Sequence, residues 1–262
     1  IHFAASKAVG ESVEKPLLYY ENNLNTLVYM LKNILKLSSS NFIFSSSCTV
    51  YGQADEMPIL ESAPVKKAES PYGNTKQIGE EIISDVCKVN SNFSAIALRY
   101  FNPIGAHPSA HIGELPLGVP QNLVPFITQT AAGLRDELSV FGDDYPTPDG
   151  TCIRDYIHVV DLAKAHVVAM ERLLENKNKE NYEVFNIGTG KGSSVLEVIK
   201  SFERVSGEKL NYKFAPRRTG DITMAYAETS RSNEDLGWKA ESSLDEAMQS
   251  AWDWERKVRN LD

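Results

Sequence analysis

The sequence has few cysteines and none in a short paired motif. Cys48, Cys87 and Cys152 lie far apart in the 262 residues, and no Cys-x-x-Cys pair occurs. We therefore expect reduced thiols, a cytosolic protein, and neither a disulfide framework nor a structural zinc. Apolar runs of membrane-spanning length and a signal peptide are also missing from the sequence, so we expect no membrane association.

Positive charge is outweighed by negative charge. Lysine and arginine number 27 against 35 aspartates and glutamates, which gives a net charge of −8. This balance argues against nucleic acid or anionic lipid as the main partner. Histidine is scarce too: His107 and His111 are four apart, but Pro108 and Gly113 predict a loop there. We expect no metal site.

The first residue is not methionine, and Ile1 to Ala5 resembles the end of a buried parallel strand. We therefore expect an N-terminal portion that this numbering does not include.

What the sequence does contain is an alternation of apolar strands and amphipathic helices. Helices are predicted over 16–37 and 72–90, and strands over 41–44 and 94–101. This order predicts an α/β fold, a Rossmann-like doubly wound parallel sheet with right-handed crossovers.

The amino-acid composition changes after residue 102. Residues 103–121 are rich in proline, glycine and histidine, which predicts a long loop. We assign residues 1–102 to the first domain, with 156–181 returning to it, and 103–262 mainly to a smaller α/β domain. Further helices are predicted over 122–134, 161–175, 194–205 and from 244, and strands over 138–141, 182–187 and 210–214. Capping residues are expected at Ser194 with Glu197, and at Ser242 with Asp245.

The most informative pattern for chemistry is Tyr72-x-x-x-Lys76. Residues four apart lie about one turn from each other on one helix face. An ammonium beside a phenol stabilises the phenolate, so the tyrosine can act as a base. By itself the pattern also describes a surface tyrosine beside a solvated lysine. Ser47 at the end of a predicted strand adds a hydroxyl that can hold a carbonyl or carbinol oxygen together with Tyr72, unless it is only a loop serine.

Three cationic side chains lie in predicted loops or at strand ends. Lys7 follows the first strand, where phosphates or a ribose would lie, although a solvated lysine is the alternative. Arg154 and Arg218 are flanked by glycines and suit a diphosphate. Phe141 can stack on a flat base or serve the core. The glycines at 188, 190 and 192 predict a tight strand-to-helix turn, because their spacing is not Gly-x-Gly-x-x-Gly.

With these residues together, the chain resembles the UDP-glucose 4-epimerases, a family of extended short-chain dehydrogenase/reductases. The resemblance covers nearly the whole chain. It is carried by His2 to Val9, Phe44 to Gly52, Ser70 to Lys76, Arg99 to Pro103, Asp143 to Thr147, Arg154 to Val159 and Arg217 to Asp221.

The resemblance implies NAD as cofactor and a UDP-hexose inverted at C4 through a 4-keto intermediate. Tyr72 would take the 4-hydroxyl proton with help from Ser47, and Lys76 would lower the tyrosine pKa and bind the nicotinamide ribose. Lys7 and Asn22 resemble further NAD contacts. The residues that resemble the uridine and diphosphate contacts are Asn102, Asn122, Leu123, Phe141, Arg154, Arg218 and Asp221. A homodimer through the helices 16–37 and 72–90 is also implied.

The chain departs from the family in one respect. The family begins with a strand and a Gly-x-x-Gly-x-x-Gly turn that cradles the pyrophosphate, and residues 1–262 contain no such turn. We therefore expect the isolated chain to lack the NAD phosphate site and to be inactive alone.

In the family, one position after the arginine–aspartate segment decides whether an N-acetyl group fits beside the sugar. Our register places Ala225 there, or Tyr226 if it slips by one. A small residue implies activity on UDP-N-acetylglucosamine as well as UDP-glucose.

Three alternatives remain open. A sugar-nucleotide 4,6-dehydratase of the same family would carry Thr-Asp-Glu after the serine strand, whereas this chain has Cys48-Thr49-Val50-Tyr51. A catalytically silent NAD-sensing protein would not need Ser47, Tyr72 and Lys76. A truncated, inactive fragment is the third.

Overall fold

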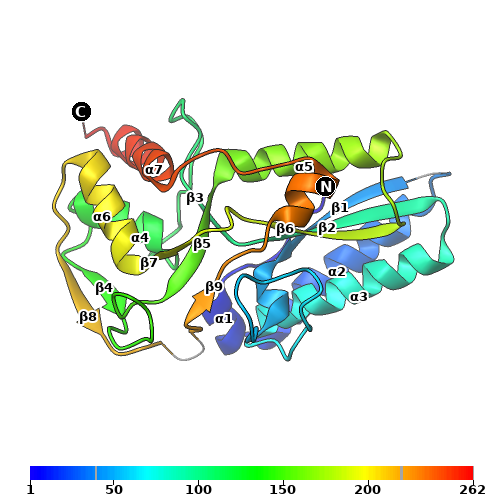
Figure 1. Ribbon diagram of the computed structural model, residues 1–262, viewed down its shortest axis with the longest axis horizontal. Coiled ribbons are helices and arrows are strands. Elements are labelled where there is room, and N and C mark those ends of the chain that lie inside the picture. Colours follow the sequence, from blue (N-terminus) through cyan, green and yellow to red (C-terminus); the bar gives the residue numbers. More distant parts are fainter. Residues whose placement is uncertain (39, 219–220, 262) are drawn as a thin grey trace. The chain divides into compact units, whose positions relative to one another are not determined.

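The chain divides into two compact units, each of which is described by itself. The computed structural model describes residues 1–38, 40–218 and 221–261. Unit 1 comprises Ile1–Tyr100, Lys164–Ile187 and Ala227–Lys239, and unit 2 comprises Phe101–Ala163, Gly188–Tyr226 and Ala240–Asp262 (Figure 1). The domain division given from the sequence stays a prediction.

Unit 1 is built on a parallel sheet with the strand order β1-β2-β6. These strands are β1 (Ser40–Ser47), β2 (Phe93–Tyr100) and β6 (Tyr182–Ile187). Ser47 pairs with Tyr100 and Tyr100 with Ile187, so the three strands end together. The predicted α/β fold with a parallel sheet is confirmed.

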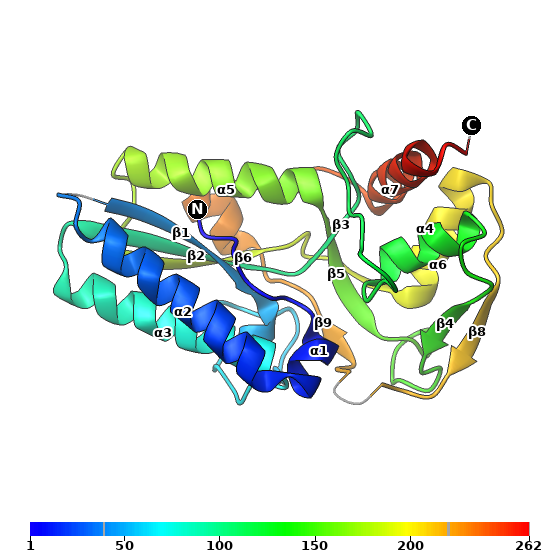
Figure 2. The ribbon, with the colours of Figure 1, turned by 180° about the vertical axis from the view of Figure 1, so that it is seen from behind.

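Helices α2 (Pro16–Ile34) and α3 (Pro71–Val89) cover one face of this sheet. Their apolar stripes meet strand residues whose side chains share that face, because strand side chains alternate. Figures 1 and 2 show α5 (Val159–Leu174) on the other side of the sheet. The core on the α2 and α3 side contains Leu27, Leu31, Phe42, Phe44, Ile83, Cys87, Phe93, Ala95 and Ala97.

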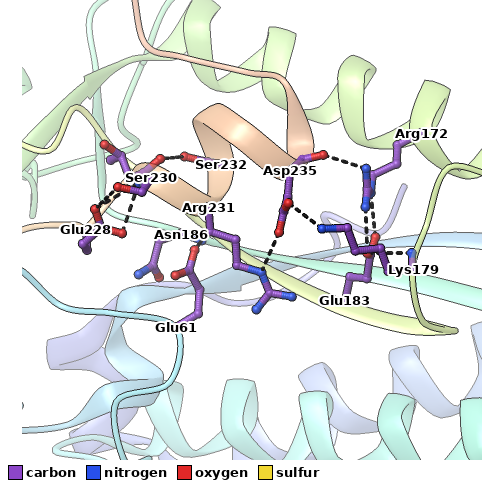
Figure 3. A network of polar contacts seen from close by, with 11 residues as sticks. Glu61, Arg172, Lys179, Glu183, Asn186, Glu228, Ser230, Arg231, Ser232 and Asp235 are labelled. Carbon is purple, nitrogen blue, oxygen red and sulfur yellow. Dashed lines mark hydrogen bonds and ion pairs between the residues drawn. The ribbon is translucent and has the colours of Figure 1, made fainter.

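A late segment of the chain, 227–239, returns to unit 1. It contains a short π-helix, Ser232–Leu236, and is held by a polar network (Figure 3). Arg172 pairs with Glu183 at 2.7 Å and also donates to the Asp235 carbonyl at 2.6 Å. The Lys179 ammonium reaches the Asp235 carboxylate at 2.6 Å. Charged side chains from α5, β6 and the π-helix are therefore tied together.

Unit 2 holds a four-stranded mixed sheet and a two-stranded parallel sheet. In the first, β5 (Ile153–His158) pairs in parallel with β3 (Asn102–Ile104) and β9 (Met224–Ala225), and antiparallel with β7 (Gly192–Ser194). The second joins β4 (Leu138–Phe141) to β8 (Tyr212–Ala215). Three helices supply much of the core, and these are α4 (Leu123–Ala131), α6 (Val195–Ser206) and α7 (Leu244–Arg259).

Most predicted elements are found within a few residues of their expected bounds, and the capping box of Ser194 with Glu197 is confirmed. The predicted cap of α7 is wrong by one residue, since Ser243 and Glu246 form it. Asp245 instead accepts from Ser201 at 2.6 Å and pairs with Arg204. A short helix, α1 (Val9–Glu14), was not expected.

Two further details differ from expectation. The expected opening strand is reduced to a single bridge between His2 and Phe44, and the loop expected over 103–121 begins inside β3. Among the residues that the structure describes, no helix combines the length and the apolar character needed to span a membrane.

Candidate active site

The three predicted catalytic residues lie in unit 1, at the end of β1 and in the first two turns of α3. Ser47 is the last residue of β1, and its Oγ accepts from the Thr49 amide at 3.2 Å. Tyr72 lies in the first turn of α3, because the Ser70 hydroxyl caps that helix and Pro71 is its first residue. Ser47, Tyr72 and Lys76 are 7%, 8% and 5% exposed. Tyr72 and Lys76 are thus a buried pair, not a solvated one.

Lys76 is fixed by a backbone carbonyl of β1. Its Nζ donates to the Ser45 oxygen at 2.7 Å and lies 5.7 Å from the centroid of the Tyr72 ring. The Phe44 ring centroid is 5.0 Å away. Burial lowers the pKa of Lys76 from its ordinary value of 10.5 to about 8, and the Glu80 carboxylate opposes this change. An ammonium carries three donors, so the lysine can bind a ligand hydroxyl as well as Ser45.

The pKa of Tyr72 moves in the opposite direction to the one expected. Burial raises this pKa well above 10, the neighbouring Tyr100 adds to the rise, and a hydrogen bond with Ser47 opposes it. The expectation that Lys76 lowers the pKa is wrong for the structure described here. The ammonium is directed to the Ser45 carbonyl, and removal of the phenol from water favours its neutral form.

The predicted cofactor contacts Lys7 and Asn22 lie near the start of unit 1. Lys7 is exposed, and the Asn22 amide donates to the Ser6 hydroxyl at 3.0 Å. An ammonium and an amide can donate to the hydroxyl and phosphate groups of a dinucleotide, and the role of these two residues as cofactor contacts stays a prediction.

Asn23 is a residue that sequence reasoning missed. Its buried side chain accepts from the Ser6 amide at 2.7 Å and donates to the Ser6 carbonyl and to Thr75 Oγ1, both at 3.0 Å. It therefore ties the Ser6 turn to α3, one residue before Lys76. An available signal was its place on the inner stripe of α2, four residues from Leu27.

Predicted substrate contacts gather in unit 2. The Arg218 guanidinium lies 4.9 Å from the Phe141 ring centroid and donates to the Asp221 carboxylate at 3.0 Å. Phe141 ends β4 and is half-buried. The structure therefore brings these three residues together, with a cation on the aromatic ring. Thr219 and Gly220, the middle of the motif that carries Arg218, lie outside the described residues.

Arg154 and Ala225 are adjacent in the sheet of unit 2. Their strands, β5 and β9, are in register at this pair, and Arg154 Nη1 donates to the Ile153 carbonyl at 2.8 Å. Ala225 is buried, at 3% exposed, whereas Tyr226 is half-buried. Tyr226 directly follows β9, which ends at Ala225.

The remaining predicted contacts are more scattered. Asn102 begins β3 in register with Tyr156, and Leu123 is the half-buried first residue of α4. Asn122 immediately precedes α4 and is exposed, and its amide donates to Glu114 at 2.7 Å. No contact brings Asn122 to Arg154 or Arg218 in the part of the chain that the structure describes.

The glycine turn that follows β6 binds a carboxylate of the chain itself. Asp155 accepts from the Thr189 amide at 2.8 Å and the Gly190 amide at 3.1 Å, and it is 0% exposed. Sequence reasoning missed Asp155, which lies next to Arg154. The amides most suited to an anion are therefore engaged, in keeping with the prediction of a structural turn.

His158 is a core histidine, buried with its Nε2 3.2 Å from Ser250 Oγ. Within residues 1–38, 40–218 and 221–261, no group of three or more histidine, cysteine, aspartate or glutamate residues is arranged to hold a metal ion.

Comparison with known proteins finds relatives that match nearly the whole chain. A family model described as GDP-mannose 4,6 dehydratase matches residues 1–251. A UDP-glucose 4-epimerase of Cyamopsis tetragonoloba is 50% identical over 257 residues, which are 98% of this chain and 73% of that protein. The UDP-glucose 4-epimerase of Bacillus subtilis is 49% identical over 255 residues, which are 97% of this chain and 74% of that protein.

A solved structure of a UDP-glucose 4-epimerase also matches this chain. The UDP-glucose 4-epimerase of Bifidobacterium longum in complex with NAD+ and UDP superposes with a TM-score of 0.93 and 48% identity. The match covers 99% of this chain and 76% of that one.

Proposed function

The chain belongs to the UDP-glucose 4-epimerase family, and we propose that it interconverts UDP-glucose and UDP-galactose by inverting the sugar at C4. The observation that carries the proposal is the buried set of Ser47, Tyr72 and Lys76 at the end of a parallel strand. A hydroxyl, a phenol and an ammonium gathered there provide the acid–base groups that removal and return of a hydroxyl proton require.

In this proposal Tyr72 takes the proton of the 4-hydroxyl as C4 is oxidised to the ketone, and returns a proton after the sugar has turned. Ser47 donates a hydrogen bond to the same sugar oxygen. NAD, when bound, would supply the acceptor for the C4 hydride and the donor for its return to the opposite face. Lys76 holds the nicotinamide ribose through its ammonium donors. Lys7 and Asn22 contact the cofactor.

Unit 2 supplies the groups for the nucleotide part of the substrate. Arg154 and Arg218 neutralise the diphosphate, because planar guanidinium groups pair well with phosphate oxygens. Ala225, as a small residue, leaves room for an N-acetyl group, so UDP-N-acetylglucosamine is a second substrate. The remaining contacts to the nucleotide are Asn102, Asn122, Leu123, Phe141 and Asp221.

A 4,6-dehydratase is the second candidate, because the matching family model carries that description. Elimination needs an acid beside the serine. The 3₁₀ helix that follows Ser47, Cys48–Tyr51, contains no acidic residue. An epimerase, which needs no elimination, is therefore preferred. A silent NAD sensor is disfavoured because burying Tyr72 and Lys76 together serves chemistry better than binding alone.

The test is turnover of UDP-glucose, UDP-galactose and UDP-N-acetylglucosamine by the polypeptide as the cell makes it, with products separated by chromatography. Tyr72→Phe should reduce the rate by a factor of 100 or more, on the order of what one acid–base group supplies. Tyr212→Phe, an exposed tyrosine on β8, is the matched control and should keep the rate. A 4-keto-6-deoxy product would favour the dehydratase, and full activity of Tyr72→Phe would refute the mechanism.

Two finer points belong to the same proposal. Residues 1–262 contain no Gly-x-x-Gly-x-x-Gly turn, so these residues alone should bind NAD weakly and turn over slowly. We also propose a homodimer through α2 and α3. Tyr29 and Met30 of α2 are 65% and 45% exposed, and two adjacent exposed apolar side chains of this kind can pack against a second copy of the helix. A cytosolic location stays a prediction.

A further inference from the structure

Glu80 lies on the same face of α3 as Tyr72 and Lys76, at successive spacings of four residues. Its carboxylate is buried, at 7% exposed. Arg99 Nε donates to it at 2.9 Å and Arg99 Nη2 at 2.5 Å, from strand β2. Arg99 is itself 6% exposed, so the two charges form a buried pair.

The same carboxylate also binds β1. The Ser46 hydroxyl donates to Glu80 Oε1 at 2.5 Å. Ser46 stands between Ser45, whose carbonyl binds the Lys76 ammonium, and Ser47, the proposed acid–base serine. The Glu80 carboxylate therefore joins α3 to residues 45–47 of β1. This segment carries Ser45, which binds Lys76, and Ser47, which is proposed to act with Tyr72.

Arg99 is held in turn by other parts of unit 1. Its guanidinium lies 4.8 Å from the Tyr51 ring centroid, and Nη1 donates to the Glu61 carbonyl at 3.4 Å. A buried carboxylate with two directional partners resists rotation and sliding of the helix that carries it, because either movement would leave a buried charge unpaired.

From this geometry we propose that Glu80 is a positioning residue of the reaction, one that sets the place of Tyr72 and Lys76 relative to Ser47 and presents a negative charge on the helix face that carries the ammonium. The proposal rests on the proposed function. Glu80 touches no reacting atom, and it acts through α3 and β1.

The effect of the Glu80 carboxylate on the pKa of Lys76 has a defined direction. Burial favours the neutral form of Lys76, and the Glu80 carboxylate is the group that raises the lysine pKa. His2 also faces this ammonium, and its own pKa is lowered by burial and by Lys76. Tyr72 is the third titratable neighbour, with its ring 5.7 Å from the ammonium. Loss of the carboxylate would therefore shift Lys76 toward the neutral form at a lower pH.

The test compares Glu80→Gln with Glu81→Gln, which removes the same charge from the next, exposed position of α3. In the holoenzyme, Glu80→Gln should lower kcat on the order of 10- to 100-fold with little change in KM, the size of effect that a misplacement near 1 Å causes. The alkaline fall of the pH–rate profile should move to lower pH. In Glu81→Gln both should stay as in the wild type.

A second readout does not depend on turnover. Carbon-13 NMR of the lysine side chains, with Lys76 assigned from Lys76→Met, should give a lower Lys76 pKa in Glu80→Gln. Arg99→Met breaks the same buried pair but leaves the carboxylate, so its Lys76 pKa should rise. If Glu80→Gln does not fold, the double variant Glu80→Gln with Arg99→Met removes both charges and should still lower the Lys76 pKa.

Equal losses of rate in Glu80→Gln and Arg99→Met, with the Lys76 pKa and the pH profile unchanged, would show a merely structural pair and overturn the proposal. Glu80→Asp keeps the charge, and partial recovery of kcat is expected. If the wild type does not turn over UDP-hexoses, the proposed function fails, whereas the NMR comparison still decides the role of Glu80.

Discussion

Lys76 shows at the scale of one residue how a reactive group is maintained at a cost in stability. A lowering of its pKa from 10.5 to about 8 corresponds to a free-energy cost of roughly 3 kcal/mol for burying the charged form. The Ser45 carbonyl and the Glu80 carboxylate offset part of the desolvation. A purely structural position would more simply carry an apolar residue.

We predict that wild-type stability rises as the pH passes from 8 to 10.5. In that window the unfolded lysine keeps its proton while the folded one loses it, so the unfolded state binds more protons and the free energy of unfolding increases. Lys76→Met removes this dependence. In urea denaturation, the free energy of unfolding should therefore rise by about 2 kcal/mol more in the wild type than in Lys76→Met between pH 7.5 and pH 9.5. Lys88→Met, at an exposed lysine, should behave as the wild type. Equal increments in Lys76→Met and the wild type would contradict the assigned pKa.

Ala225 carries a second prediction at this scale. Ala225→Tyr should reduce turnover of UDP-N-acetylglucosamine relative to UDP-glucose by about tenfold or more, because a phenol fills the space that an N-acetyl group needs. The ratio of kcat/KM for the two sugars is the measurement, and the unfolding temperature serves as a check, since Ala225 is buried. An unchanged ratio in a folded variant would place the specificity elsewhere.

At the scale of elements, the positions of helices and strands are set by caps and by buried charge pairs. The Ser194 and Ser243 capping boxes start α6 and α7, and Ser70 starts α3. The network of Arg172, Glu183 and Asp235 attaches segment 227–239 to unit 1 (Figure 3). A local signal marks each cap, whereas the network joins residues far apart in the chain.

Glu183→Gln is predicted to lower the free energy of unfolding by about 3–5 kcal/mol, because Arg172 is left buried without a counter-charge. The double variant with Arg172→Met should recover part of this loss. Denaturant titration gives the free energies, and hydrogen exchange should rise first in segment 227–239. A loss below about 1 kcal/mol would mean that water already screens the pair.

At the scale of the whole molecule, the acidic balance and the exposed face of α2 bear on assembly. The net charge of −8 favours small-molecule and protein partners over polyanions. The proposed dimer would bury Tyr29 and Met30, which are exposed in the single chain.

Tyr29→Asp is accordingly expected to shift the protein from dimer to monomer in sedimentation velocity, because burying an unpaired carboxylate in an interface is costly. Val167→Asp is the matched control, an exposed apolar residue of α5. A dimer that survives Tyr29→Asp would place the interface on another surface, and a monomeric wild type would remove the proposal.

Local patterns along the chain were enough to predict the α/β class and the bounds of most elements, and they singled out Ser47, Tyr72 and Lys76 as candidate catalytic residues. Periodicity and caps are local properties, so they can be found without a partner in space, and the spacing of Tyr72 and Lys76 fixes a shared helix face. The one-residue error at the cap of α7 arose where Asp245 had an alternative partner in Arg204.

Which groups those residues contact depends on how distant segments of the chain pack together. Lys76 donates to Ser45, Asp155 binds the glycine turn, and Glu80 joins Arg99 and Ser46 across 19 and 34 residues of chain. No local pattern encodes such pairs, because packing of distant segments creates them. The direction of the Tyr72 pKa shift also depends on the packing of distant segments, because burial of the phenol is a property of the folded chain.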